Sequence, residues 1–238
     1  MHKDSATLSI NAAASKREAV LQRIRQACLA SQRDPEEVRL LAVSKTQPAA
    51  ALQTLYDSGQ RDFGENYLQE ALEKMPQLPA DVCWHFIGPL QSNKTRPIAE
   101  HFDWVHSLAS LKHAERLAAQ RPPERSPLNV CIQVNLEAEA SKSGLDARGA
   151  ASLAATIRQL PQLRLRGLMS IPSPSDDPQQ QARQFAAVAQ LAAELGPDCA
   201  ELSLGMSADL EQAIAAGSRW VRIGTALFGP RPRPTSQG

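Results

Sequence analysis

The sequence lacks the features that mark several large classes of protein. Its 26 lysines and arginines nearly balance its 25 aspartates and glutamates, so nucleic acid or an anionic membrane is not expected as a partner. No apolar run approaches the length that spans a bilayer. The first residues, from Met1 to Ser5, lack the basic and apolar segments of a signal peptide. These absences predict a soluble cytoplasmic protein.

Cysteine is also scarce. The four cysteines, Cys28, Cys83, Cys131 and Cys199, are widely spaced, and no two form a CxxC pair. This pattern predicts free, buried thiols in a reducing compartment rather than a disulfide framework. No cluster of histidine and cysteine has zinc spacing, so no metal is expected.

What the sequence does contain is a regular alternation of short apolar runs and amphipathic segments. Eight runs are predicted as strands, at 40–43, 61–66, 82–87, 103–107, 128–134, 163–169, 201–204 and 220–223. Helices are predicted at 12–30, 48–58, 67–74, 92–101, 111–119, 146–159, 179–195 and 207–216. Eight strand–helix alternations predict an α/β fold, a single (β/α)8 TIM barrel with an extra N-terminal helix.

The length and composition fit one such barrel. The chain has 238 residues, of which 42% are hydrophobic, which is enough for one sizeable core. We expect residues 1–230 to form this domain. The proline-rich tail at 231–238 cannot hydrogen-bond as a helix or strand and is expected to be disordered.

Lys45 stands where the first strand ends and Pro48 begins the next helix. A lysine at the carboxyl end of a parallel strand points into the region where barrel active sites are built. An uncharged amine there can form an imine with an aldehyde. The ordinary alternative is a surface lysine whose stem lies along apolar neighbours.

Two glycine-bearing turns lie near the end of the chain. Gly205 to Asp209 follows the seventh predicted strand, with Ser207 or Asp209 as a candidate helix N-cap, and Gly224-Thr225 follows the eighth. Backbone N–H groups at such turns bind anions, and barrels often bind phosphate after strands seven and eight. A phosphate cradle facing an imine-forming lysine describes a site for pyridoxal 5'-phosphate.

A polar or small residue stands where each predicted strand ends. Each alone could be a strand cap or turn residue, but together they favour a site at the barrel mouth. They are Lys45, Asn66, His85, His106, Asn135, Ser170, Ser207 and Arg222. His85 and His106 could instead be core histidines, and Asn66 could cap the following helix.

Seven motifs resemble the YggS/PROSC family of pyridoxal phosphate homeostasis proteins, over about residues 34–229. They are VSKT (43–46), FGENY (63–67), WHFIGPLQSNK (84–94), KSG (142–144), GLMSIP (167–172), GMSAD (205–209) and VRIGTA (221–226). The resemblance implies a fold-type III barrel like the N-terminal domain of alanine racemase, with Lys45 as the imine lysine. Ser207, Gly224 and Thr225 would hold the phosphate, and Arg222 would face the pyridine nitrogen. Asn66, His85, Ser170 and Met206 complete the expected cofactor-binding set.

The family implies regulation or carriage of vitamin B6 rather than robust catalysis, and the residues agree. A charged arginine beside the pyridine nitrogen weakens the ring as an electron sink. Racemisation also needs an acid/base group on each face of the substrate carbon. In alanine racemase a tyrosine of the partner subunit supplies one of them. Here the only tyrosines are Tyr56 and Tyr67, of which only Tyr67 is predicted near the mouth.

Two alternatives stay open from the sequence. One is an amino-acid racemase of low activity, and the other is a phosphosugar barrel enzyme with Lys45 as an imine base. The motif match along the whole chain counts against the second. Because the sequence ends shortly after the eighth strand, we expect no second racemase domain, and therefore a monomer. Amino acids and transient apoenzymes of pyridoxal phosphate are its expected partners besides the cofactor.

Overall fold

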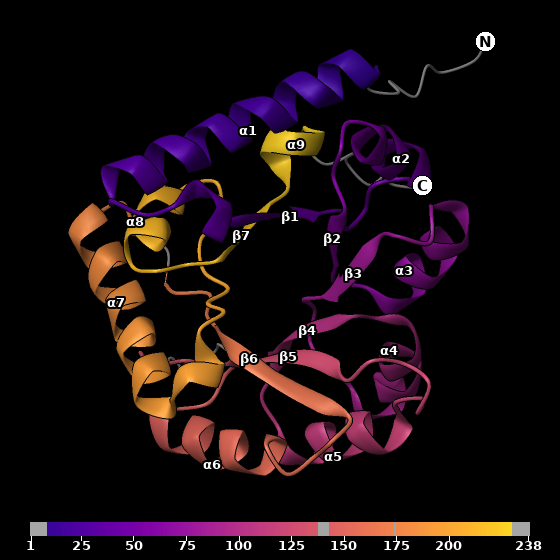
Figure 1. Ribbon diagram of the computed structural model, residues 1–238, viewed down its shortest axis with the longest axis vertical. Coiled ribbons are helices and arrows are strands. Elements are labelled where there is room, and N and C mark those ends of the chain that lie inside the picture. Colours follow the sequence, from indigo (N-terminus) through magenta and orange to yellow (C-terminus); the bar gives the residue numbers. More distant parts are fainter. Residues whose placement is uncertain (1–8, 138–142, 174, 230–238) are drawn as a thin grey trace, which may run out of the picture.

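The structure is a computed structural model and describes residues 9–137, 143–173 and 175–229. Seven parallel strands curl into a barrel in the order β6-β5-β4-β3-β2-β1-β7, with the helices outside (Figure 1). The strands are β1 (Arg39–Val43), β2 (Asp62–Glu65), β3 (Cys83–Phe86), β4 (Trp104–Leu108), β5 (Leu128–Gln133), β6 (Leu163–Met169) and β7 (Trp220–Ile223). The predicted tail at 231–238 and Lys142 of the KSG motif lie outside the described residues.

Helices follow the strands as the alternation predicted. They are α1 (Ile10–Ala30), α2 (Ala49–Asp57), α3 (Leu68–Lys74), α4 (Thr95–His101), α5 (Leu111–Gln120), α6 (Ala147–Ile157), α7 (Pro178–Leu195), α8 (Leu210–Ala215) and α9 (Thr225–Phe228). Short 3-10 turns are η1 (Pro35–Glu37), η2 (Met75–Gln77), η3 (Ser92–Lys94) and η4 (Pro197–Cys199). The extra helix α1 begins at its N-cap Ser9 and lies across α2, α8 and α9 (Figure 1). None of the helices among the described residues is long and apolar enough to cross a membrane.

The run predicted as the seventh of eight strands closes the barrel without forming a regular strand. Ser203 makes isolated parallel bridges to Met169 of β6 and Trp220 of β7. Its backbone still bonds to both neighbours, since the Ser203 N–H donates to the Leu168 carbonyl at 2.9 Å and the Leu204 N–H donates to the Trp220 carbonyl at 3.2 Å. The Ser218 hydroxyl also donates to the carbonyls of Leu204, at 2.8 Å, and Trp220, at 3.1 Å. Arg222 donates to the carbonyl of Ser203. The TIM-like fold is confirmed, but its eighth position is an irregular segment.

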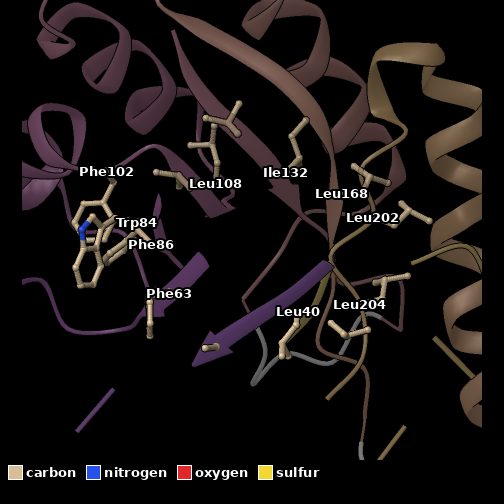
Figure 2. Packing of buried hydrophobic residues seen from close by; sticks show 14 of the residues in the cluster. Leu40, Phe63, Trp84, Phe86, Phe102, Leu108, Ile132, Leu168, Leu202 and Leu204 are labelled. Carbon is tan, nitrogen blue, oxygen red and sulfur yellow. The ribbon is translucent and has the colours of Figure 1, made fainter. Parts of the chain in front are cut away.

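Successive residues of each strand point alternately outward, towards the helices, and inward, into the barrel, so the apolar side chains form two layers. Trp84 and Phe86 of β3 face the helices, where Phe86 packs edge-on against Phe102 with ring centroids 5.4 Å apart (Figure 2). Full burial of one such side chain contributes about 1.5–3 kcal/mol. A smaller cluster fills the barrel interior and consists of Leu41, Trp104, Cys131, Met169 and Trp220. As predicted, the cysteines are free; Cys28, Cys131 and Cys199 are buried, and Cys83 is half-buried.

Candidate functional site

One cavity of about 330 Å³ opens at the carboxyl ends of the strands. This volume lies in the range of roughly 300–1,000 Å³ that is usual for small-molecule sites. Seven of the nine predicted cofactor-binding residues line it, namely Lys45, Asn66, Met206, Ser207, Arg222, Gly224 and Thr225. The apolar part of the wall comes from Val43, Ile87, Met169 and Ile171. The structure therefore brings the lysine, the arginine and both glycine turns to one place.

Lys45 lies in a tight turn directly after β1, and α3 holds both of its neighbours. Thr46 has a left-handed φ of 64°, which a β-branched residue adopts only when its surroundings fix it. The backbone N–H of Thr46 donates to Oε2 of Glu70 at 2.8 Å. On the other side of Lys45, Nζ of Lys74 donates to the carbonyl of Ser44 at 3.0 Å. These two contacts hold the backbone on both sides of Lys45 and so fix the direction of its side chain.

A buried ion pair lies beneath this turn. Nζ of Lys74 is 2.8 Å from Oε1 of Glu65, and the Ser44 hydroxyl donates to the same oxygen at 2.7 Å. Burial raises the pKa of Glu65, against the opposing effects of Lys74 and Ser44. Sequence analysis missed this network. The available signal was Lys74 at the same helical spacing as the apolar residues Leu68 and Ala71, all three of which are buried in α3.

The first glycine turn is built by close packing. Gly205 has a φ of +87°, and an added Cβ would lie 2.5 Å from Cβ of Ala213 in α8. Of the two candidate N-caps, Asp209 is the N-cap residue of α8, but its side chain makes no capping hydrogen bond. Oδ1 of Asp209 instead accepts from the N–H of Met206 at 2.6 Å, so the chain turns once more and α8 begins only at Leu210.

The N-terminal helix α1 contacts the Gly205–Asp209 turn from outside the barrel. Nη1 of Arg23 in α1 donates to the carbonyl of Ser207 at 2.7 Å. The same guanidinium forms a bidentate ion pair with Glu211 of α8, with contacts of 2.5 and 2.7 Å. The second glycine turn follows the neighbouring strand β7, and Thr225 begins α9 immediately after Gly224. Ser207 and Thr225, one from each turn, thus line the same cavity.

Arg222 brings a positive charge to the cavity wall although it is buried. Its Nη2 donates to the carbonyl of Ser170 at 3.0 Å, and its Nη1 donates to the hydroxyl of Ser203 at 2.9 Å. Burial lowers the pKa of Arg222 to about 10, so the guanidinium is still a cation at neutral pH. Three acceptors, counting the Ser203 carbonyl, fix its plane.

Asn66 offers the cavity an unused acceptor. Its Oδ1 is buried and has no hydrogen-bond partner among the described residues. Its backbone is held by Gly88, where an added Cβ would lie 2.0 Å from the Asn66 carbonyl oxygen. A buried amide oxygen without a partner costs free energy, which a polar ligand would relieve. The residues present therefore fit a small ligand with an aldehyde, a ring and an anionic group.

The structure does not bring His85 or Ser170 to the cavity lining. Ser170 is buried behind it, where its hydroxyl donates to Val134 and its carbonyl holds Arg222. His85 and His106 lie within β3 and β4 and are fully buried, which is the core alternative that the sequence left open. Their side chains point into the barrel, where His85 Nδ1 and His106 Nε2 are 3.0 Å apart.

The two tyrosines also lie apart from the cavity lining. The hydroxyl of Tyr56 donates to Asp81 at 2.5 Å, with the Arg61 guanidinium 3.8 Å above its ring. Tyr67 precedes α3 and is 52% exposed. Among the described residues that line the cavity, only Lys45 and Arg222 are ionisable.

Comparison with known proteins places the chain in a family. Residues 17–232 match the family described as alanine racemase, N-terminal domain. A pyridoxal phosphate homeostasis protein of Pseudomonas aeruginosa is 58% identical over 214 residues, or 89% of this chain and 93% of that one. One from Escherichia coli is 52% identical, covering 84% of this chain and 88% of that one.

Solved structures agree with this relationship. PipY of Synechococcus elongatus, with PLP bound, has a TM-score of 0.75 at 42% identity and covers 86% of this chain and 98% of that one. Alanine racemase of Bartonella henselae, with covalently bound pyridoxal phosphate, has a TM-score of 0.73 at 20% identity. This second match covers 96% of this chain and 62% of that one, and shows a shared fold. The chain therefore belongs to the pyridoxal phosphate homeostasis protein family, and its barrel is of the alanine racemase N-terminal type.

Proposed function

We propose that this protein binds pyridoxal 5'-phosphate in the cavity at the barrel mouth and regulates intracellular vitamin B6, without robust catalysis. The observation that carries the proposal is the convergence of Lys45, Arg222 and two glycine turns on one cavity. Relatives at 58% and 52% identity are named pyridoxal phosphate homeostasis proteins, and the PipY structure contains PLP. When bound, the cofactor supplies an aldehyde that condenses with a primary amine.

The residues expected to bind the cofactor have separate proposed roles. Lys45 provides the amine for covalent attachment, and the α3 contacts to its neighbours orient it. Ser207, Thr225 and the backbone amides at Gly224 hold the phosphate. Arg222 faces the ring nitrogen and, as a buried cation, disfavours a proton there. Met206 covers the ring, and Asn66 donates or accepts a hydrogen bond at its edge, whereas Ser170 acts only by holding Arg222.

The wider setting is also proposed. We infer a monomer that works in the cytoplasm, exchanges its cofactor with amino acids or transiently with apoenzymes, and limits the free aldehyde in the cell. The support is the family name, which concerns homeostasis rather than a reaction, and a cavity whose ionisable lining consists of Lys45 and Arg222. The competing function is a racemase of low activity, which the shared barrel favours.

The phosphate cradle gives the direct test of this function. Ser207→Ala combined with Thr225→Val removes two hydroxyls that we expect to donate to the phosphate. Because each charge-assisted hydrogen bond contributes roughly 1.5–3 kcal/mol, affinity for pyridoxal 5'-phosphate should fall at least about tenfold. Spectrophotometric titration measures it. The matched control, Ser152→Ala with Thr156→Val on α6, should bind like the wild type.

A second ligand makes this test specific to phosphate. Pyridoxal, which lacks the phosphate, should lose far less affinity in the double variant than the phosphorylated cofactor does. Equal losses for both ligands would rule out a phosphate cradle at these turns. Failure of the wild type to bind either ligand would overturn the proposed function itself.

The protein should not racemise amino acids at the rate of an enzyme. Racemisation requires a second acid/base group opposite Lys45, and the described cavity lining offers none besides Arg222, which stays protonated. The absence of such a group costs typically 10²–10⁴-fold. Incubation with D- and L-amino acids, followed by chiral chromatography, should show turnover below about one per second. A faster rate that Lys45→Ala abolishes would favour the racemase.

A further inference from the structure

A chain of buried polar groups runs through the barrel from the cavity to the opposite end. Nη1 of Arg222 is 2.9 Å from the Ser203 hydroxyl, and that hydroxyl is 2.8 Å from Nδ1 of His106. Nε2 of His106 is 3.0 Å from Nδ1 of His85, and Nε2 of His85 is 3.0 Å from Oδ1 of Asp62. Ser203, His106 and His85 are fully buried, whereas the Asp62 side chain is 26% exposed.

The chemistry of the two ends fixes the direction of every bond between them. A guanidinium only donates and a carboxylate only accepts, so protons must point from Arg222 towards Asp62 throughout. His85 therefore carries its proton on Nε2, and its Nδ1 accepts from Nε2 of His106. Nδ1 of His106 then accepts from the Ser203 hydroxyl, whose oxygen accepts from Arg222. With both imidazoles neutral, each nitrogen and oxygen of the chain has one partner of the right kind.

The opposite polarity leaves a buried group unpaired. If His85 carried two protons, His106 would have to donate from Nδ1 to Ser203, and the Ser203 oxygen would receive two donors. No further acceptor contacts the Ser203 hydroxyl proton among the described residues, and a buried donor without a partner is costly. The burial of His106 also favours its neutral form, because burial holds the pKa of this imidazole well below its ordinary value.

Aromatic packing prevents the imidazoles from rotating out of this arrangement. The ring of His85 stacks on Trp104 with an interplanar angle of 9° and meets Trp220 edge-on, with centroids 4.8 Å apart. His106 lies between the same two indoles. Cys83 is close to Asp62 and His85, with ligand atoms within 4.8 Å of one another, but burial raises the pKa of its thiol. Nε2 of His85 and Oδ1 of Asp62 are already hydrogen-bonded to each other, so we take Asp62 as the end of the chain.

We propose that Ser203, His106, His85 and Asp62 are positioning residues that hold Arg222 at the cofactor cavity through a one-way hydrogen-bonded relay across the barrel interior. The relay explains why two histidines and a serine are buried where a barrel usually has apolar side chains. It rests on the proposed function only in that Arg222 faces the bound cofactor. The direction of the relay itself is a property of the protein alone.

The direction is tested on the wild-type protein without cofactor. Long-range proton–nitrogen NMR on protein with ¹⁵N-labelled histidine reports which ring nitrogen carries the proton. We expect His85 and His106 to be neutral at pH 7, with both protons on Nε2. A proton on Nδ1 of either residue would overturn the relay, whether or not the protein binds pyridoxal 5'-phosphate.

The positioning role is tested by a pair of buried serines. Ser203→Ala removes one acceptor of Arg222 and the donor to His106, whereas Ser218→Ala removes an equally buried hydroxyl that contacts only backbone groups. We expect Ser203→Ala to lower cofactor affinity about threefold to tenfold and to shift the pH midpoint of the bound cofactor's absorbance. Ser218→Ala should keep the wild-type midpoint.

The outcomes separate this relay from the proposed function. Identical midpoints and affinities in the two serine variants would overturn the positioning role, even with the expected tautomers. If the wild type has both imidazole protons on Nε2 but binds no cofactor, the relay direction stands and the proposed function is wrong. If Ser203→Ala does not fold, His106→Phe, which breaks the relay one step further on, is compared with Ser218→Ala by the same two readouts.

Discussion

Lys45→Ala should abolish covalent attachment of pyridoxal 5'-phosphate, while the wild type purifies yellow and is fixed to the cofactor by borohydride. Lys45 is the only lysine among the described residues that line the cavity, and the turn around it is held in place by Glu70 and Lys74. Mass spectrometry of the reduced and digested protein locates the modified lysine. The expected result is stoichiometric labelling of Lys45 in the wild type and none in the variant.

A matched control separates this lysine from lysines near the mouth in general. Lys94 is exposed in η3, and Lys94→Ala should be labelled on Lys45 like the wild type. The assignment is wrong if Lys45→Ala keeps a reducible cofactor of the same stoichiometry on another single lysine. Weak labelling spread over several exposed lysines would not contradict the assignment of Lys45, since any free amine reacts with an aldehyde at high concentration.

The fold was predictable because hydrophobic periodicity decides it. The runs at 163–169 and 220–223 coincide with β6 and β7, and the other predicted strands except 201–204 agree within one or two residues at each end. The run at 201–204 was predicted as a strand because it is apolar. In the structure Ser203 makes only isolated bridges to its two neighbours, a difference that the apolar pattern does not reveal.

The cavity could be predicted in part for the same reason. Parallel strands bring their carboxyl ends together, so residues near those ends, such as Arg222 within β7 and Lys45 after β1, converge without further information. His85 lies inside the predicted run at 82–87, but the sequence left open whether its side chain lines the mouth or is buried in the core. In the structure β3 continues to Phe86, and alternation turns His85 inward.

The buried pair of Glu65 and Lys74 was beyond sequence reasoning for a different physical reason. Charged residues are seldom buried unless they are paired, and the pairing here joins the end of β2 to the end of α3. Glu65 alone suggests a helix cap, and Lys74 alone suggests a surface cation near a helix C-terminus. Only their distance of 2.8 Å, with Ser44 on the same oxygen, shows that they support the Lys45 turn.

Lys74→Met should destabilise the protein by about 3–5 kcal/mol at neutral pH. The substitution leaves the fully buried carboxylate of Glu65 with the Ser44 hydroxyl as its remaining partner, and Oε2 of Glu65 already has none among the described residues. It also frees the carbonyl of Ser44 beside Lys45. Urea unfolding followed by circular dichroism measures the loss. In the double variant with Glu65→Gln, which removes the buried charge, we expect part of the stability to return.

The pH dependence identifies the cause. Burial already raises the pKa of Glu65, and loss of Lys74 removes an effect that lowers it, so the pKa rises further in the variant. A carboxyl with a raised folded-state pKa stabilises the fold at low pH, and this contribution is lost as the pH rises through that pKa. The deficit of Lys74→Met relative to the wild type should therefore be smaller at pH 5 than at pH 7.5, and the double variant should show little such trend. A deficit independent of pH, or a double variant as unstable as Lys74→Met, would mean that lost packing rather than the stranded carboxylate dominates.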